Sequence, residues 1–101
     1  MSTFLRTPSV YATKLGDGST VATIVNWRER VYSDFQFRIE DLGVEPSSSQ
    51  LIEVWDLWTH ELLGIYTHEE IETFGVKNIP GHGNFTYKFK LVDQDTPLIA
   101  Q

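Results

Sequence analysis

Alternating hydrophobic and polar positions run along much of the chain and predict β-strands. Residues 34–40 alternate clearly, with Phe35, Phe37 and Ile39 on one face and polar side chains at the even positions. Residues 84–92 alternate again, with an aromatic residue or leucine at each odd position from Phe85 to Leu91. Because successive side chains of a strand point to opposite faces, a period of two describes a strand with one buried face.

Turn signals separate further candidate strands. Residues 8–15 lead into the turn GDG at residues 16–18, and residues 19–27 follow with many β-branched side chains. Residues 41–43 close the strand that ends at Glu40, and residues 43–50 form a polar loop. Residues 51–56, 62–66 and 72–79 are further candidates, and residues 80–83 form a turn. About seven or eight short strands predict an all-β sandwich or barrel.

Residues 54–70, VWDLWTHELLGIYTHEE, allow two interpretations. The apolar side chains between Val54 and Tyr66 form a stripe at helical spacing. The interior Gly64, the β-branched and aromatic content and the β context favour strand, turn, strand instead. Trp55 and Trp58 are three positions apart, so on a strand they would point to opposite faces and at least one is expected in the core.

The same stretch carries two histidines, which raises the question of a metal site. His60 and Glu61 begin an H-E-x-x-H motif, but Gly64 stands where the second histidine is needed. His60 and His68 could still meet across a hairpin, with Glu69 or Glu70 adding an oxygen ligand. Residues of this kind more often lie in polar turns, so no metal and no cofactor are expected.

Paired carboxylates are the enzymatic alternative. Glycoside hydrolysis needs two carboxyl groups about 5–9.5 Å apart, and Glu53 with Asp56 or Asp34 with Glu40 are candidates. Acids that alternate with apolar residues are typical of a solvent-facing strand surface, which is the favoured interpretation. The chain has no cysteine and no G-x-S-x-G motif. No catalytic residue is therefore assigned.

Length and charge limit the organisation and the partners. The 101 residues predict one domain, which we place at residues 1–92 with a C-terminal tail at residues 93–101. A net charge of −6 argues against nucleic acid, which needs clustered lysine and arginine. No apolar run approaches the roughly 20 residues of a membrane span. The start, MSTFLRTPSV, lacks the apolar core of a signal peptide, which leaves a cytosolic protein or a segment of a larger one.

Two features bear on carbohydrate. Trp27, Trp55 and Trp58 offer apolar ring faces on which a sugar could stack, although structural tryptophans are the commoner case. Asn84-Phe85-Thr86 is an N-x-[ST] sequon, so Asn84 is the candidate glycan attachment residue if a parent protein is secreted.

Short motifs in a fixed order suggest a family. Residues 54–58 spell VWDLW, residues 62–64 LLG, and residues 79–83 IPGHG ahead of a last strand with Tyr87. VNW at residues 25–27 ends one strand, and DLG at residues 41–43 closes the next. In this order, over about residues 10–92, the chain resembles the C-terminal domain of the alpha-galactosidase (melibiase) family, glycoside hydrolase family 27. Residues 75–78 and the length of the last strand depart from the family pattern.

The resemblance implies an antiparallel β-sandwich with Greek-key-like connections and no catalytic residues of its own. In that family a (β/α)₈ barrel carries the chemistry, and 101 residues are too few for such a barrel. The expected role is a non-catalytic accessory domain that packs on the barrel and stabilises it; the alternative is an independent carbohydrate-binding module. A parent enzyme of this family would be secreted or lysosomal or vacuolar. The matching positions imply structural roles: Trp55, Asp56, Leu57, Trp58, Gly64, Pro80, His82 and Gly83.

Overall fold

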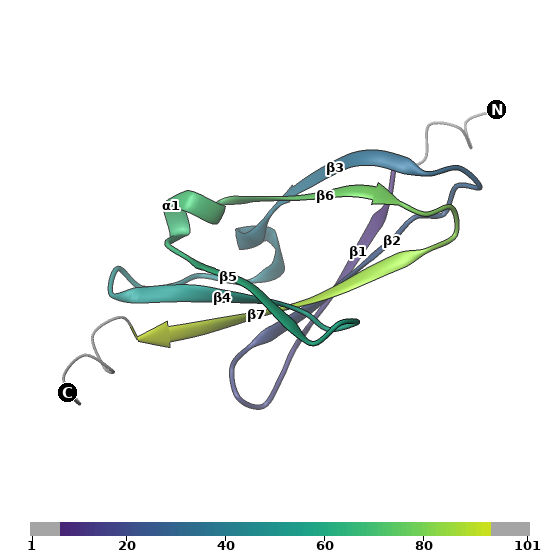
Figure 1. Cartoon of the computed structure of the whole chain (residues 1–101). Helices are drawn as coiled ribbons and strands as arrows, with labels where there is room; N and C mark the ends of the chain where they lie inside the picture. Colours follow the sequence, from purple (N-terminus) through teal and green to yellow (C-terminus); the bar gives the residue numbers. More distant parts are fainter. Residues whose placement is uncertain (1–6, 94–101) are drawn as a thin grey trace.

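Strands form at the alternating segments, and a computed structural model describes them over residues 7–93 (Figure 1). The elements are, in chain order, β1 (Ser9–Lys14), β2 (Thr20–Val25), β3 (Tyr32–Arg38), the 3₁₀ helix η2 (Ile39–Leu42), β4 (Gln50–Asp56), β5 (Glu61–Tyr66), α1 (His68–Ile71), β6 (Thr73–Ile79) and β7 (Asn84–Asp93). Asp93 ends β7, and the remainder of the expected tail, residues 94–101, lies outside the described residues.

The seven strands of this part of the chain form two antiparallel sheets. A five-stranded sheet has the order β1-β2-β7-β4-β5, and β3 pairs with β6 in a second sheet (Figure 1). Only β1–β2 and β4–β5 are hairpins of consecutive strands; the chain crosses between sheets at each of the other connections, and β7 returns between β2 and β4. The predicted antiparallel β-sandwich with Greek-key-like connections is confirmed.

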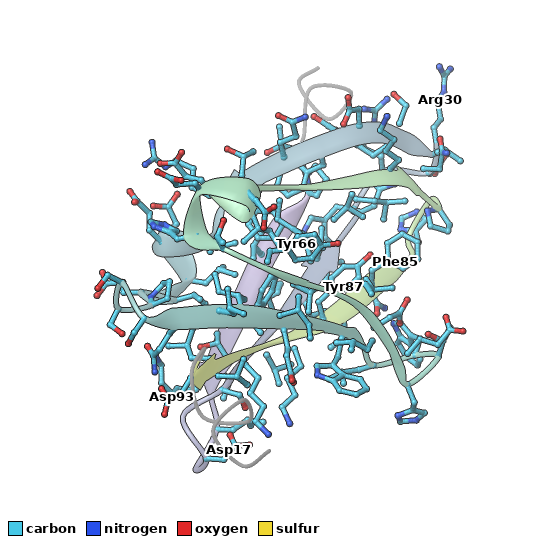
Figure 2. The ribbon with its side chains drawn as sticks, turned by 60° about the vertical axis from the view of Figure 1, so that its left-hand side comes forward. Asp17, Arg30, Tyr66, Phe85, Tyr87 and Asp93 are labelled. Atoms are coloured by element: carbon cyan, nitrogen blue, oxygen red, sulfur yellow. The ribbon has the colours of Figure 1, made fainter. Side chains whose placement is uncertain are left out.

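The core lies between the two sheets and is built from the inward side of each strand. β2 contributes Ala22 and Ile24, and β4 contributes Ile52 and Val54, all fully buried. Phe74 of β6 links the layers, because its ring meets Tyr87 and Phe89 of β7 edge to face at centroid distances of 5.0 and 5.3 Å. Figure 2 shows Tyr66, Phe85 and Tyr87 pointing into the space between the sheets. Such aromatic pairs add to the free energy gained by apolar burial.

Residues 54–66 form strand, turn, strand, and the helical alternative is wrong. The β-ladder between β4 and β5 explains why, since Ile52 pairs with Tyr66 and Val54 with Gly64 on the inward face. The ring of Tyr66 lies across Gly64, in the space a Cβ atom would fill. A register shift between Val54 and Trp55 marks a bulge in this hairpin.

The strand expected at residues 34–40 is displaced by two residues, since β3 begins at Tyr32. β3 ends at Arg38, and η2 begins at Ile39, whose side chain is nonetheless fully buried. The period-two pattern located the buried face but not the end of the strand. Gly43 closes η2 in the left-handed conformation with φ of 85°, as the predicted stop at residues 41–43 requires.

Strand β6 departs from simple alternation at Asn78. Val76 and Ile79 are both buried although they are three positions apart. Asn78 has a positive φ of 56°, which breaks the alternation and returns Ile79 to the core. A short asparagine side chain tolerates this left-handed conformation better than most residues do.

Helix α1 was not predicted, although its capping signal is in the sequence. Thr67 Oγ1 accepts a hydrogen bond from the Glu70 backbone N–H at 3.2 Å. Glu70 Oε1 accepts one in return from the Thr67 backbone N–H at 2.8 Å. This is the reciprocal capping box of a T-x-x-E sequence, here Thr67-His68-Glu69-Glu70. The turn interpretation of His68 is therefore replaced by the first turn of a helix.

We expect Thr67→Ala to lower the free energy of unfolding by about 1 kcal/mol, because it removes the side-chain half of the cap. Urea unfolding followed by tryptophan fluorescence measures the change. Ser48→Ala, at an exposed loop position, is the matched control and should shift stability by less than about 0.5 kcal/mol. Equal effects of the two substitutions would show that the cap contributes nothing.

Candidate functional site

The motif residues around Asn26 and residues 79–83 meet at one end of the sandwich. The Asn26 side chain is fully buried. Its Nδ2 donates to the carbonyl oxygens of Arg30 at 2.8 Å and of Ile79 and Pro80 at 3.0 Å each. Its Oδ1 accepts from the Arg28 backbone N–H at 3.0 Å. One amide therefore holds the β2–β3 loop against the β6–β7 turn.

The turn at residues 80–83 fits closely against the same loop. The His82 backbone N–H donates to Arg28 O at 2.8 Å, and His82 itself has φ of 56°. A Cβ atom on Gly81 would overlap the carbonyl group of Glu29. A Cβ atom on Gly83 would lie 3.0 Å from Pro80 Cβ. Pro80, His82 and Gly83 thus stand in a tight turn.

The VWDLW motif ends β4 and starts the turn to β5. Asp56 Oδ1 accepts hydrogen bonds from the backbone N–H groups of Trp58 at 2.8 Å and Thr59 at 3.2 Å, so it shapes the turn. Trp55 is half-buried, and Trp58 lies beyond the strand with 63% of its surface exposed. The expectation that one of these two indoles would lie in the core is wrong, because Trp58 is in the turn and Trp55 faces outward.

Neither candidate carboxylate pair comes together as a catalytic pair. On β4, Glu53 points outward with its partner Ile65, whereas Asp56 points inward with its partner Tyr87. Glu53 Oε1 accepts from Trp55 Nε1 at 3.0 Å, so both acids have structural partners. Burial, with a smaller effect of the Asp56 charge, raises the pKa of the Tyr87 hydroxyl. Two acids on opposite faces of a strand cannot flank one sugar.

The second pair is also separated. Asp34 lies on the outward face of β3, and Glu40 lies in η2, where its carboxylate pairs with Arg38 at 3.0 Å. Elsewhere, the side chain and backbone N–H of Ser19 hold the pKa of Asp17 below its usual value. Asp17 is exposed at the β1–β2 turn (Figure 2).

The histidines do not gather. His60 lies in the β4–β5 turn with φ of 61°, and His68 lies in α1. Within residues 7–93, no three histidine or acidic side chains are grouped so that they could hold a metal ion. Over that same range, no helix has the length and apolar character to cross a membrane.

The outward faces of the two sheets differ in character. Cross-strand partners point to the same side of a sheet, so the register assigns each side chain to a face. The outward face of β3–β6 is polar, with Asp34 opposite Lys77 and Arg38 opposite Thr73. The outward face of the five-stranded sheet instead carries apolar side chains on every strand, although its central strand β7 is mostly polar there. We call its apolar members the outer apolar face: Tyr11, Val21, Val25, Leu51, Trp55, Leu62, Ile65 and Val92.

The outer apolar face spans the sheet from edge to edge. Tyr11 on β1 is 55% exposed, and Leu62 and Ile65 on β5 are 43% and 49% exposed. Three charged residues lie on the same side of the sheet: Glu53 and Lys90 stand opposite each other on β4 and β7, and Lys88 of β7 pairs with Asp17 at 3.7 Å. Sequence reasoning missed this surface. Its signal is residues 20–25, TVATIV, where apolar side chains occupy both faces of β2 rather than one.

The Asn84 side chain is exposed at the first residue of β7. We predict that the chain, secreted from a glycosylating eukaryotic host, gains the mass of one N-glycan. Mass spectrometry should show that Asn84→Gln removes the added mass. Asn78→Gln is the control, since Asn78 is an exposed asparagine outside any sequon. Added mass that survives Asn84→Gln, or no added mass in the parent chain, would refute the assignment.

Comparison with known proteins identifies the family to which the chain belongs. The family model described as the alpha galactosidase C-terminal beta sandwich domain matches residues 6–89. Among curated proteins none matches. Several solved structures do match: alpha-galactosidase I from Mortierella vinacea has 23% identity and a TM-score of 0.65, and covers 81% of this chain and 20% of its own.

Two bacterial structures show the same likeness. A GH27 β-L-arabinopyranosidase from Geobacillus stearothermophilus has 20% identity and a TM-score of 0.63 over 80% of this chain. A putative alpha-N-acetylgalactosaminidase from Bacillus halodurans has 16% identity and a TM-score of 0.65 over 82% of this chain. The chain spans 16% and 17% of their lengths. These likenesses show the fold, and the matched family model shows the membership: this chain belongs to the alpha-galactosidase C-terminal β-sandwich domain family.

Proposed function

We propose that the chain is a non-catalytic accessory domain that packs against the (β/α)₈ catalytic barrel of an alpha-galactosidase-like glycoside hydrolase and stabilises it. The observation that carries the proposal is the family match over residues 6–89, combined with a fold that accounts for only a fifth or less of the related chains. The candidate carboxylates support it, because each acid of the β4 pair faces away from the other.

A fusion enzyme tests the proposal. The chain replaces the matched fifth of Mortierella vinacea alpha-galactosidase I, and the same enzyme without that fifth serves as the reference. We expect the truncated enzyme to lose activity faster on heating and the fusion to regain a longer half-life, because a domain that binds the folded state stabilises it. The 101-residue chain alone should not hydrolyse p-nitrophenyl α-galactoside.

Two results would contradict the proposed role. The first is a fusion that inactivates as fast as the truncated enzyme. The second is turnover by the isolated chain that a single Asp→Asn substitution abolishes. The second result would make the chain an enzyme in its own right.

A second candidate function rests on Trp58. Its indole is 63% exposed at the tip of the β4–β5 turn, where a ring face can stack on a sugar. We propose carbohydrate binding there as the alternative role. Titration with galactosides should quench tryptophan fluorescence in the parent chain and in Trp27→Ala, but not in Trp58→Ala. No saturable response to any galactoside would exclude this alternative.

A further inference from the structure

We propose that the outer apolar face of the five-stranded sheet is the surface through which this domain contacts its catalytic barrel. The inference rests on the proposed accessory function and specifies where the contact lies. It starts from the difference between the two sheets. A solvated sheet face is normally polar, as the outward face of β3–β6 is, whereas the outer apolar face carries large exposed side chains at both edges.

The geometry favours a partner that lies flat on the sheet rather than one that adds a strand to its edge. β5 is one of the two edge strands of this sheet and carries the exposed Leu62 and Ile65. The register shift opposite Trp55 interrupts regular pairing in this strand, and bulges of this kind protect edges from a further strand. The side chains remain exposed, so the partner must cover side chains.

Charge and anchoring also fit a close, dehydrated contact. The Glu53 carboxylate accepts a hydrogen bond from the Trp55 indole N–H and stands opposite Lys90. Burial of this region would therefore not leave a carboxylate without a partner. Trp55 is half-buried near the end of β4, opposite the exposed Leu62, and its ring is held in place by that hydrogen bond. Rigidly held aromatic residues are common anchors of binding surfaces.

The choice of a barrel domain rather than a second copy rests on chain length and connection. The related solved chains are about five times longer than the part this chain matches. β1, the first described strand, is itself an edge strand of this sheet and carries Tyr11. A preceding domain of the same polypeptide would therefore connect at the β1 edge of this sheet.

Charge insertion into the fusion enzyme tests the surface. Tyr11→Lys probes the β1 edge, and the double variant Leu62→Lys/Ile65→Lys probes the β5 edge. All three positions are exposed in the isolated chain, so its unfolding midpoint should not change. In the fusion we expect about tenfold faster heat inactivation from at least one of these variants. Gln36→Lys, exposed on the outward face of β3, is the control and should leave the half-life unchanged.

The outcomes separate the inference from the function on which it depends. A parent fusion that protects the enzyme, together with face variants that protect it equally well, would overturn the surface and leave the accessory function standing. A parent fusion that gives no protection would overturn both. Sedimentation of the isolated chain should show a monomer; a dimer abolished by Leu62→Lys/Ile65→Lys would identify a second copy as the occupant and refute the barrel.

Discussion

Replacing Asn26 with alanine should lower the free energy of unfolding by about 2–4 kcal/mol. The substitution removes the amide that serves three carbonyl oxygens and one backbone N–H, and each buried polar group left without a partner costs about 1–3 kcal/mol. A domain of this size is stable by only about 5–15 kcal/mol, so the loss is a large fraction of the total. Urea unfolding of the purified chain measures it.

Two further variants isolate the cause. Asn26→Asp keeps an oxygen for the Arg28 backbone N–H but loses both donors and brings a negative charge against the carbonyls of Ile79 and Pro80. Asn26→Asp should lower the free energy of unfolding by about as much as Asn26→Ala does. Asn84→Ala removes an exposed asparagine and should change stability by less than about 0.5 kcal/mol. A loss below about 1 kcal/mol for Asn26→Ala would show that the two loops hold together without the amide.

Gly81→Ala is expected to cost about 2–4 kcal/mol for a different reason. A Cβ atom at residue 81 would overlap the carbonyl of Glu29, which is backbone and cannot rotate away as a side chain could. The two loops must therefore separate, and overpacking of this kind is among the few causes of large destabilisation. Thermal unfolding followed by circular dichroism reports the effect.

Two other glycines provide matched controls for the Gly81 prediction. Gly16 has no atom within 4 Å of a built Cβ atom, so Gly16→Ala should be neutral or slightly stabilising. Gly18 is equally open but has φ of 89°, so Gly18→Ala should cost about 1 kcal/mol through backbone strain alone. If Gly81→Ala destabilises the protein no more than Gly18→Ala does, the two loops can separate at little cost. The close approach of the loops would then not explain the glycine at position 81.

The sequence predicted the fold class well because period-two patterning reports directly on the buried face of a strand. Phe35 and Phe37, and likewise Tyr87 and Phe89, face the core as their spacing indicates. The ends of strands were harder to predict from the sequence, because Ile39 continues the apolar pattern although its backbone already belongs to the 3₁₀ helix η2. At residues 54–66 only the pairing of β4 with β5 excludes a helix, and the spacing of apolar residues along one segment does not reveal that pairing.

The long-range contacts of the motif residues could not be predicted from spacing. Asn26 lies 53 and 54 positions from the carbonyls of Ile79 and Pro80 that it binds. Gly81 and Glu29 are likewise brought together only when β2, β6 and β7 are placed in space. Two of the motifs that suggested the family, VNW and IPGHG, are thus the two halves of one structural connection. The carboxylates and histidines that suggested chemistry lie on separate elements or, for Glu53 and Asp56, on opposite faces of one strand.

The account depends most on the claim that the outer apolar face is covered when this domain is joined to a catalytic barrel. Hydroxyl-radical footprinting reads solvent access at aromatic and aliphatic side chains, and compares the isolated chain with the Mortierella vinacea fusion. We predict a fall of about threefold or more in the labelling of Tyr11, Leu62 or Ile65 in the fusion, because side chains covered by a partner lose contact with solvent. Equal labelling of all three residues in both proteins would contradict the account.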